Sequence, residues 1–174
     1  MKRIRIILFI SIAFLSNNLK AQLTSAIIGI DGLTCSACSY ATEKSIRKLD
    51  FVDSVFMELD KNIATVFFKK NSTVSIQLLS KKVYDAGFAV RSIYASYNFN
   101  NLNISNDFCL LQNNTAYHFV KIENEKKLNG IVSLHFIGEK YMQKKEFKNW
   151  KLFLTNSCKT SFPQITTEYY ITLN

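Results

Sequence analysis

The chain has 174 residues, of which 48% are hydrophobic and 20% charged, with five glycines and one proline. It is too apolar and too poor in turn-forming residues to be disordered or collagen-like. No internal stretch reaches the roughly 18 to 20 consecutive apolar residues that a membrane-spanning helix needs, so we do not expect an integral membrane protein. The sequence predicts a globular protein of one domain or two small ones. The role of its four cysteines depends on whether the protein resides in an oxidising compartment.

Residues 1–21 have the pattern of a secretory signal peptide. Three basic residues among the first five precede a largely apolar stretch of ten residues (6–15), and Ala21 supplies the small residue before a cleavage site. An uncleaved anchor helix is the weaker alternative, because a stretch of about ten residues spans only about half of a bilayer core. We therefore expect a periplasmic or secreted mature chain.

The positive charge is partly a property of that segment. It holds four basic and no acidic residues, so its removal lowers the formal charge from +9 to +5. The remaining lysines form no arginine-rich stripe, and we expect no nucleic-acid partner.

The mature chain opens with a βαββαβ pattern. Residues 24–30 predict a buried strand, and Ala41, Ser45, Ile46 and Leu49 recur at helical spacing behind a loop. Next come a hairpin over residues 52–68 with its turn at 60–62, a helix over 74–86 and a strand over 88–94. This order predicts an α+β, ferredoxin-like domain over residues 22–94, an antiparallel sheet with both helices on one face.

The loop before the first helix reads Gly32-Leu33-Thr34-Cys35-Ser36-Ala37-Cys38. With Val52-Asp53-Ser54-Val55 and Asp85-Ala86-Gly87-Phe88, it resembles the heavy-metal-associated domain of copper chaperones, mercury-binding periplasmic proteins and metal-pumping ATPases. The resemblance covers residues 24–94. It implies a metal-donor or metal-acceptor partner with exposed cysteines, for example a metal-transporting ATPase or a membrane transporter.

The two loop cysteines are the candidate metal ligands. Cys35 lies in the loop and Cys38 at a helix N-terminus, whose positive end favours the thiolate form. Soft sulfur ligands select soft ions, and two of them suit Cu(I) or Hg(II), whereas structural Zn(II) requires four ligands. The resemblance also favours Cu(I), because zinc, cadmium or lead modules often carry Asp where this chain has Thr34. We expect Cu(I) first, with Hg(II) or Zn(II) as alternatives.

The resemblance further assigns supporting residues to the loop. Gly32, Leu33 and Thr34 form its first half. Leu33 replaces the family's usual methionine and can fill the same hydrophobic socket at a similar volume. Phe88 stands where the family often has an aromatic residue or a lysine, and we expect it to pack and shield the site without supplying charge.

Other interpretations of Cys35 and Cys38 stay open. In an oxidising compartment the pair can close as a disulfide. A thioredoxin-like redox centre would need a proline loop facing the pair, and Pro163 lies far away in the sequence. A docking module without metal is the remaining class.

Several further residues are candidates for functional groups. Lys44, Arg47, Lys48, Lys81 and Lys82 could dock an acidic partner, although a solvated helix face is the simpler interpretation. Met57 and Met142 could be thioether ligands, and we expect Met57 in the core. His118 and His135 have no second ligand at short spacing, and we expect surface or half-buried positions for both.

Residues 95–174 predict a second domain of short strands. We expect strands at 108–111, 116–122, 131–137, 151–155 and 166–173, with one short helix at 143–150. Five strands suggest a small OB-like barrel or a sandwich. A disulfide between Cys109 and Cys158 would stabilise so small a core. The region shows no catalytic constellation, and we expect a protein that is not an enzyme.

Overall fold

The computed structural model describes residues 22–154 and 157–173, so the expected signal peptide at 1–21 lies outside the described residues. The N-terminal half contains β1 (Gln22–Asp31), α2 (Ser36–Ile46), β2 (Val52–Glu58), β3 (Ile63–Phe68) and α3 (Ile76–Asp85), followed by β4 (Ala89–Ile104). The C-terminal half contains β5 (Cys109–Gln112), β6 (Thr115–Phe119), β7 (Lys126–Ile137), α4 (Lys144–Trp150), η2 (Lys151–Phe153), α5 (Cys158–Ser161) and β8 (Thr167–Leu173). No helix of the described part is long and apolar enough to cross a membrane.

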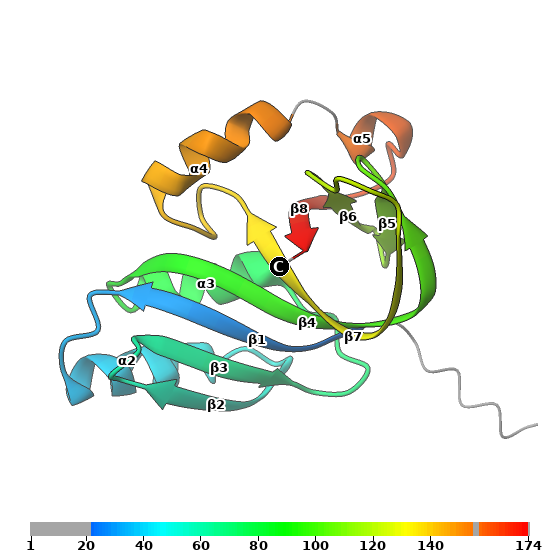
Figure 1. Ribbon diagram of the computed structural model, residues 1–174. Coiled ribbons are helices and arrows are strands. Elements are labelled where there is room, and N and C mark those ends of the chain that lie inside the picture. Colours follow the sequence, from blue (N-terminus) through cyan, green and yellow to red (C-terminus); the bar gives the residue numbers. More distant parts are fainter. Residues whose placement is uncertain (1–21, 155–156, 174) are drawn as a thin grey trace, which may run out of the picture.

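The first four strands form the expected ferredoxin-like arrangement. Their order is β2-β3-β1-β4, every pair is antiparallel, and α2 and α3 lie on one face of this part of the sheet (Figure 1). The buried face of α3 consists of Ile76, Leu79, Ser80 and Val83, at the expected spacing.

The buried face of α2 matches the expected one only in part, since Ile46 and, just after the helix, Leu49 are buried as expected. Ala41 is exposed, and the buried residues are Ser39, Thr42 and Ile46. Thr42 tolerates burial because its hydroxyl donates to the carbonyl of Cys38 at 3.0 Å. A threonine with a local hydrogen-bond partner therefore forms part of the buried face, next to the exposed Ala41.

Strand β4 joins the two halves of the molecule. It continues ten residues beyond the expected end at residue 94 and pairs with β1 on one side and β7 on the other (Figure 1). The sheet then runs on as β4-β7-β8-β6-β5, so eight strands form one sheet. A division of the chain at residue 94 would fall inside β4 and stays a proposal about folding units.

The expected architecture of residues 95–174 is wrong in two respects. The strands β5 to β8 form neither a separate barrel nor a sandwich, because they continue the sheet of the N-terminal half. The expected strand at 151–155 begins instead as the 3-10 helix η2, directly after α4. Leu152 is 80% exposed there, so the apolar pattern does not mark a buried strand. The helix expected at 143–150 is present as α4.

The main hydrophobic core is shared by both halves. A single cluster of buried residues extends from Leu23 in β1 to Ile171 in β8. Helix α3 is held from the C-terminal side as well, because the Gln77 N–H donates to Tyr169 Oη at 3.3 Å and Ser80 Oγ donates to the Lys140 carbonyl at 2.5 Å. Tyr97 lies in the same core, and burial raises the pKa of its phenol to about 12.

Candidate metal site

The two loop cysteines lie where strand β1 gives way to helix α2. Cys35 is the N-cap residue of α2, with an extended backbone (φ −145°), and its Sγ accepts the backbone N–H of Cys38 at 3.1 Å. A side chain that accepts the free N–H groups of a first helical turn is the usual way to begin a helix. The cap thus turns the Cys35 sulfur towards the residue that carries the second one.

The sulfur atoms are accessible and joined. Cys35 is exposed and Cys38 is half-buried against the core, with 5.2 Å between their Cα atoms. In the structure the pair is a disulfide, which is the oxidised form and offers no thiolate. Metal binding requires the dithiol form, so any metal chemistry at this site depends on its redox state.

The residues around the pair form a loop that packs partly against the core. Leu33 is 3% exposed and belongs to the main core, whereas Thr34 is exposed. Gly32 has φ +91°, and a Cβ at this position would lie 3.4 Å from Cδ1 of Phe88. Phe88 is half-buried against the core and lies beside the start of the loop, and its role as a shield of the site stays a prediction.

The C-terminal half contacts the base of the loop. Gln143 Nε2 donates to Asp31 Oδ2 at 2.9 Å, and Arg91 Nη1 lies 3.4 Å from the other oxygen of the same carboxylate. The Gln143 N–H also donates to the Arg91 carbonyl at 3.2 Å. Sequence reasoning missed this connection, since Asp31 and Gln143 are 112 positions apart and no local pattern relates them.

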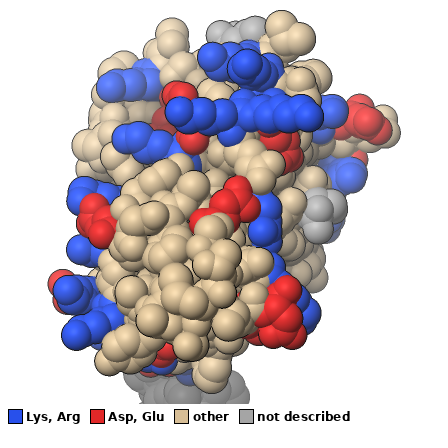
Figure 2. Space-filling view, turned by 90° about the vertical axis from the view of Figure 1, so that its left-hand side faces the viewer, with Lys and Arg blue, Asp and Glu red and all other residues tan. Residues whose placement is uncertain are grey.

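Figure 2 views the molecule from the end that carries this loop. Uncharged surface occupies the lower centre of the view, and charged side chains gather at its sides and along the top. On α2, Tyr40 is 65% exposed just after Cys38. The loop itself contains no charged side chain between Gly32 and Cys38.

The basic residues proposed as a docking face are partly engaged within the chain. Arg47 Nε lies 2.8 Å from Glu43 Oε1, and Arg47 Nη2 donates to the Val55 carbonyl at 2.8 Å. Lys81 lies 2.8 Å from Asp85, and its hydrogen bond holds the pKa of that carboxyl below the usual value. Lys82 also lies near Asp85, at 3.7 Å. These contacts favour the interpretation as a solvated, internally paired helix face.

The two histidines do not lie where the sequence pattern put them. Both were expected at the surface or half-buried, and both are buried, His118 at 1% and His135 at 6% exposure. His118 lies beside Cys109 and Cys158, which are joined to each other in the structure with 5.9 Å between their Cα atoms.

A sequence signal for the position of His118 exists. Asn113 and Asn114 both have positive φ, 46° and 59°, as a two-residue hairpin turn requires. Such a turn sets the register of β5 on β6 and pairs Cys109 with His118.

Met57 and Met142, the two methionines within the described residues, both belong to hydrophobic clusters. Met142 is 1% exposed in a cluster with Val120 and Ile137, and Met57 is half-buried against the main core. Both side chains are accounted for by packing.

Comparisons with known proteins cover the N-terminal half. The family model of the heavy-metal-associated domain matches residues 27–89. The copper chaperone CopZ of Staphylococcus haemolyticus is 32% identical over 65 residues, which are 37% of this chain and 94% of that protein. The periplasmic component of the mercuric transport protein of Pseudomonas fluorescens is 35% identical over 68 residues, 39% of this chain and 74% of that protein.

A solved structure adds a similar match. Oxidized MerP from Ralstonia metallidurans CH34 is 33% identical, with a TM-score of 0.34, and the match covers 41% of this chain and 97% of that one. On the strength of the family model and of the two sequence relatives, the resemblance suggested by the loop motif is confirmed: through its N-terminal half, the chain belongs to the heavy-metal-associated domain family.

Proposed function

We propose that this protein binds a soft metal ion, Cu(I) in the first place, between the sulfurs of Cys35 and Cys38 and passes it to a partner by thiolate exchange. The observation that carries the proposal is the placement of both cysteines at the exposed N-terminus of α2, close enough for their sulfurs to bond. One ion can bridge two sulfurs at such a spacing, and a partner's thiol can approach the exposed Cys35.

The surroundings of the loop suit such a handover. The N-terminus of α2 favours negative charge on both sulfurs, and Leu33 fixes the loop to the core. Two ligands leave the ion open to a third, which is the geometry that ligand exchange needs. Hg(II) and Zn(II) are the competing ions, and a periplasmic or secreted location is part of the proposal.

The partner in this proposal carries exposed cysteines of its own. Relatives include a probable copper-transporting ATPase of Arabidopsis thaliana, 32% identical over 66 residues that make up 6% of that protein. A metal-transporting ATPase or a membrane transporter is accordingly the class of partner that we propose.

The proposal is tested by equilibrium titration. Residues 22–174 with Cys109→Ala and Cys158→Ala, reduced under nitrogen, are titrated with Cu(I) against a chromogenic competitor such as bicinchoninate. We expect about one Cu(I) per chain, lost when Cys35→Ser and Cys38→Ser are added, because a single thiolate cannot hold the ion against the competitor. Unchanged binding in the four-substitution variant, or a preference for Zn(II) over Cu(I), would contradict the assignment.

The disulfide between Cys35 and Cys38 favours thiol redox chemistry as a second candidate. A redox protein would reduce insulin disulfides when supplied in the dithiol form and would need no metal. The metal-binding proposal predicts no insulin reduction above the background of free dithiol. A docking module predicts neither activity, and its function would survive loss of both cysteines.

A further inference from the structure

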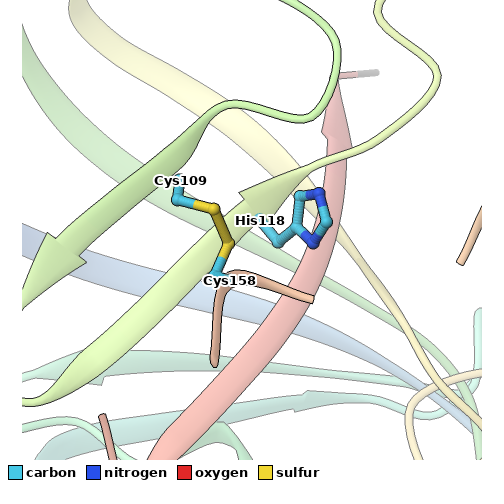
Figure 3. A group of neighbouring side chains, drawn as sticks. All are labelled: Cys109, His118 and Cys158. Atoms are coloured by element: carbon cyan, nitrogen blue, oxygen red, sulfur yellow. A yellow bond between two sulfur atoms is a disulfide. The ribbon is translucent and has the colours of Figure 1, made fainter. Parts of the chain in front are cut away.

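A second group of metal-ligating side chains lies in the C-terminal half. Cys109 and His118 are directly opposite each other in the β5–β6 hairpin, and α5 brings Cys158 to the same place (Figure 3). One ligand atom from each of the three residues lies within 4.8 Å of the other two. Three potential ligands from three elements therefore lie close together in the folded chain.

The histidine of this group is held by carboxylates. His118 is 1% exposed, its Nδ1 lies 3.2 Å from Glu168 Oε1, and its Nε2 lies 3.2 Å from Asp107 Oδ1. Glu168 is fixed in turn, because it accepts the Ser157 hydroxyl at 2.6 Å and the Cys158 N–H at 2.7 Å. A carboxylate behind an imidazole sets which ring nitrogen carries the proton and orients the other towards a metal.

We propose that, once the disulfide is reduced, Cys109, Cys158 and His118 bind a zinc ion and that Asp107 completes four ligands. Two thiolates, one imidazole and one carboxylate match the tetrahedral donor sets of Zn(II). The Asp107 side chain is 40% exposed and can turn from the imidazole to the ion, whereas Glu168 keeps its hydrogen bond to Nδ1. The charge of the donors suits a divalent ion better than Cu(I).

Exchange of the disulfide for a zinc site requires a reductant. A dithiol reductant gives two electrons and two protons to the Cys109–Cys158 bond, which becomes two thiols, and the reductant closes as a disulfide. Zinc then displaces the two thiol protons into solvent. The same two sulfurs thus cross-link α5 to the hairpin in either state, directly when oxidised and through zinc when reduced.

The test uses residues 22–174 with Cys35→Ser and Cys38→Ser, so its outcome is independent of the function proposed for the loop. The protein is reduced with tris(2-carboxyethyl)phosphine under nitrogen and titrated with zinc chloride against a chromogenic chelator. We expect about one zinc per chain in the reduced protein and none in the oxidised protein. Cobalt(II) in place of zinc gives the intense visible bands of a tetrahedral thiolate site.

Matched variants separate the ligands from general stability. His118→Asn should weaken zinc binding by at least about tenfold, and His135→Asn, at the chain's other histidine, should leave it unchanged. If the reduced, metal-free protein unfolds, zinc should restore its far-ultraviolet circular dichroism. The proposal is overturned if the reduced protein binds no zinc, if His118→Asn binds it equally well, or if zinc fails to restore a lost fold.

Discussion

At the scale of single residues, Leu33 connects the candidate metal loop to the core. It lies between Gly32 and Thr34, both exposed, and is itself 3% exposed. A buried side chain in an exposed loop fixes the loop's path, because moving the loop would expose that side chain to water. The placement of the two cysteines therefore depends on a residue that touches no metal.

Truncation of this side chain tests that dependence. Leu33→Ala should lower the free energy of unfolding by about 2 to 5 kcal/mol, because it removes buried methyl groups and leaves a cavity. Leu33→Met should cost less than about 1.5 kcal/mol, since it nearly conserves volume. Urea unfolding of both variants measures the difference. Equal stabilities of the two variants would show that the loop is not held by this contact.

His135 provides a pH-dependent term in stability. Its ring stacks on Tyr94, with 4.3 Å between the two ring centroids. Burial lowers the pKa of its imidazole below the ordinary 6.5. The folded state thus binds a proton less readily than the unfolded state, so stability is full above about pH 6.5 and falls as the pH decreases below that value.

A variant that cannot titrate isolates this effect. His135→Phe keeps an aromatic ring beside Tyr94 and should lose less thermal stability than the unsubstituted protein between about pH 7.5 and pH 5. Melting temperatures of both proteins at the two pH values give the comparison. An identical loss in both proteins would assign the acid sensitivity to other groups.

At the scale of elements, the short helix α5 is attached to the sheet mainly through Cys158. Its four residues are too few to be stable alone. Cys158 lies in a small separate cluster with Ala116 and Ile165 and is joined to Cys109 across 49 positions of sequence. The link is therefore expected to restrict the unfolded chain strongly.

Removing the link should be costly. Cys109→Ala with Cys158→Ala should lower the free energy of unfolding by about 4 kcal/mol, as the loop-closure entropy of a loop of this length predicts. Denaturant titration of the oxidised protein and of the double variant measures the loss. Peptide mapping that found Cys35 or Cys38 bonded to Cys109 or Cys158 would refute the pairing itself.

The elements also show how far sequence patterns reach. The period of Ile76, Leu79 and Val83 predicts α3 and its buried face, because local spacing decides both. The end of β4 could not be predicted, since its ten further residues are strand only because β7 pairs with them. The apolar run at η2 is indistinguishable from a buried strand until the exposure of Leu152 is known.

Some residues of the candidate sites could be predicted from local sequence, and others could not. The loop motif predicts Cys35, Cys38 and their place at a helix N-terminus, because motif and helix are adjacent in the chain. The contact of Gln143 with Asp31 and the group around His118 arise from tertiary pairing. Of these, only the Cys109–His118 pair had a local signal, the turn at Asn113 and Asn114.

At the scale of the whole molecule, β4 and the common core make the two halves interdependent. A sheet that continues from β1 through β4 to β7 leaves no edge at the junction, and the core cluster spans both sides. We therefore expect one cooperative unfolding transition for the whole chain.

Fluorescence can follow each half separately. Trp150 is the only tryptophan and reports on the C-terminal half. In a Trp150→Phe background, Phe56→Trp places a probe on β2, where the residue is 59% exposed. In urea, the fluorescence midpoint of each protein should coincide with the midpoint that circular dichroism gives for the same protein. Separate midpoints would show two independent domains.

The central claim is that Cys35 and Cys38 hold a soft ion in the working protein. Its most direct test is the metal content and thiol state of the protein isolated without oxygen from copper-supplied cells. The account predicts about one copper per chain, lost from the variant with Cys35→Ser and Cys38→Ser. Copper-free protein in which Cys35 and Cys38 remain joined despite the copper supply would contradict it.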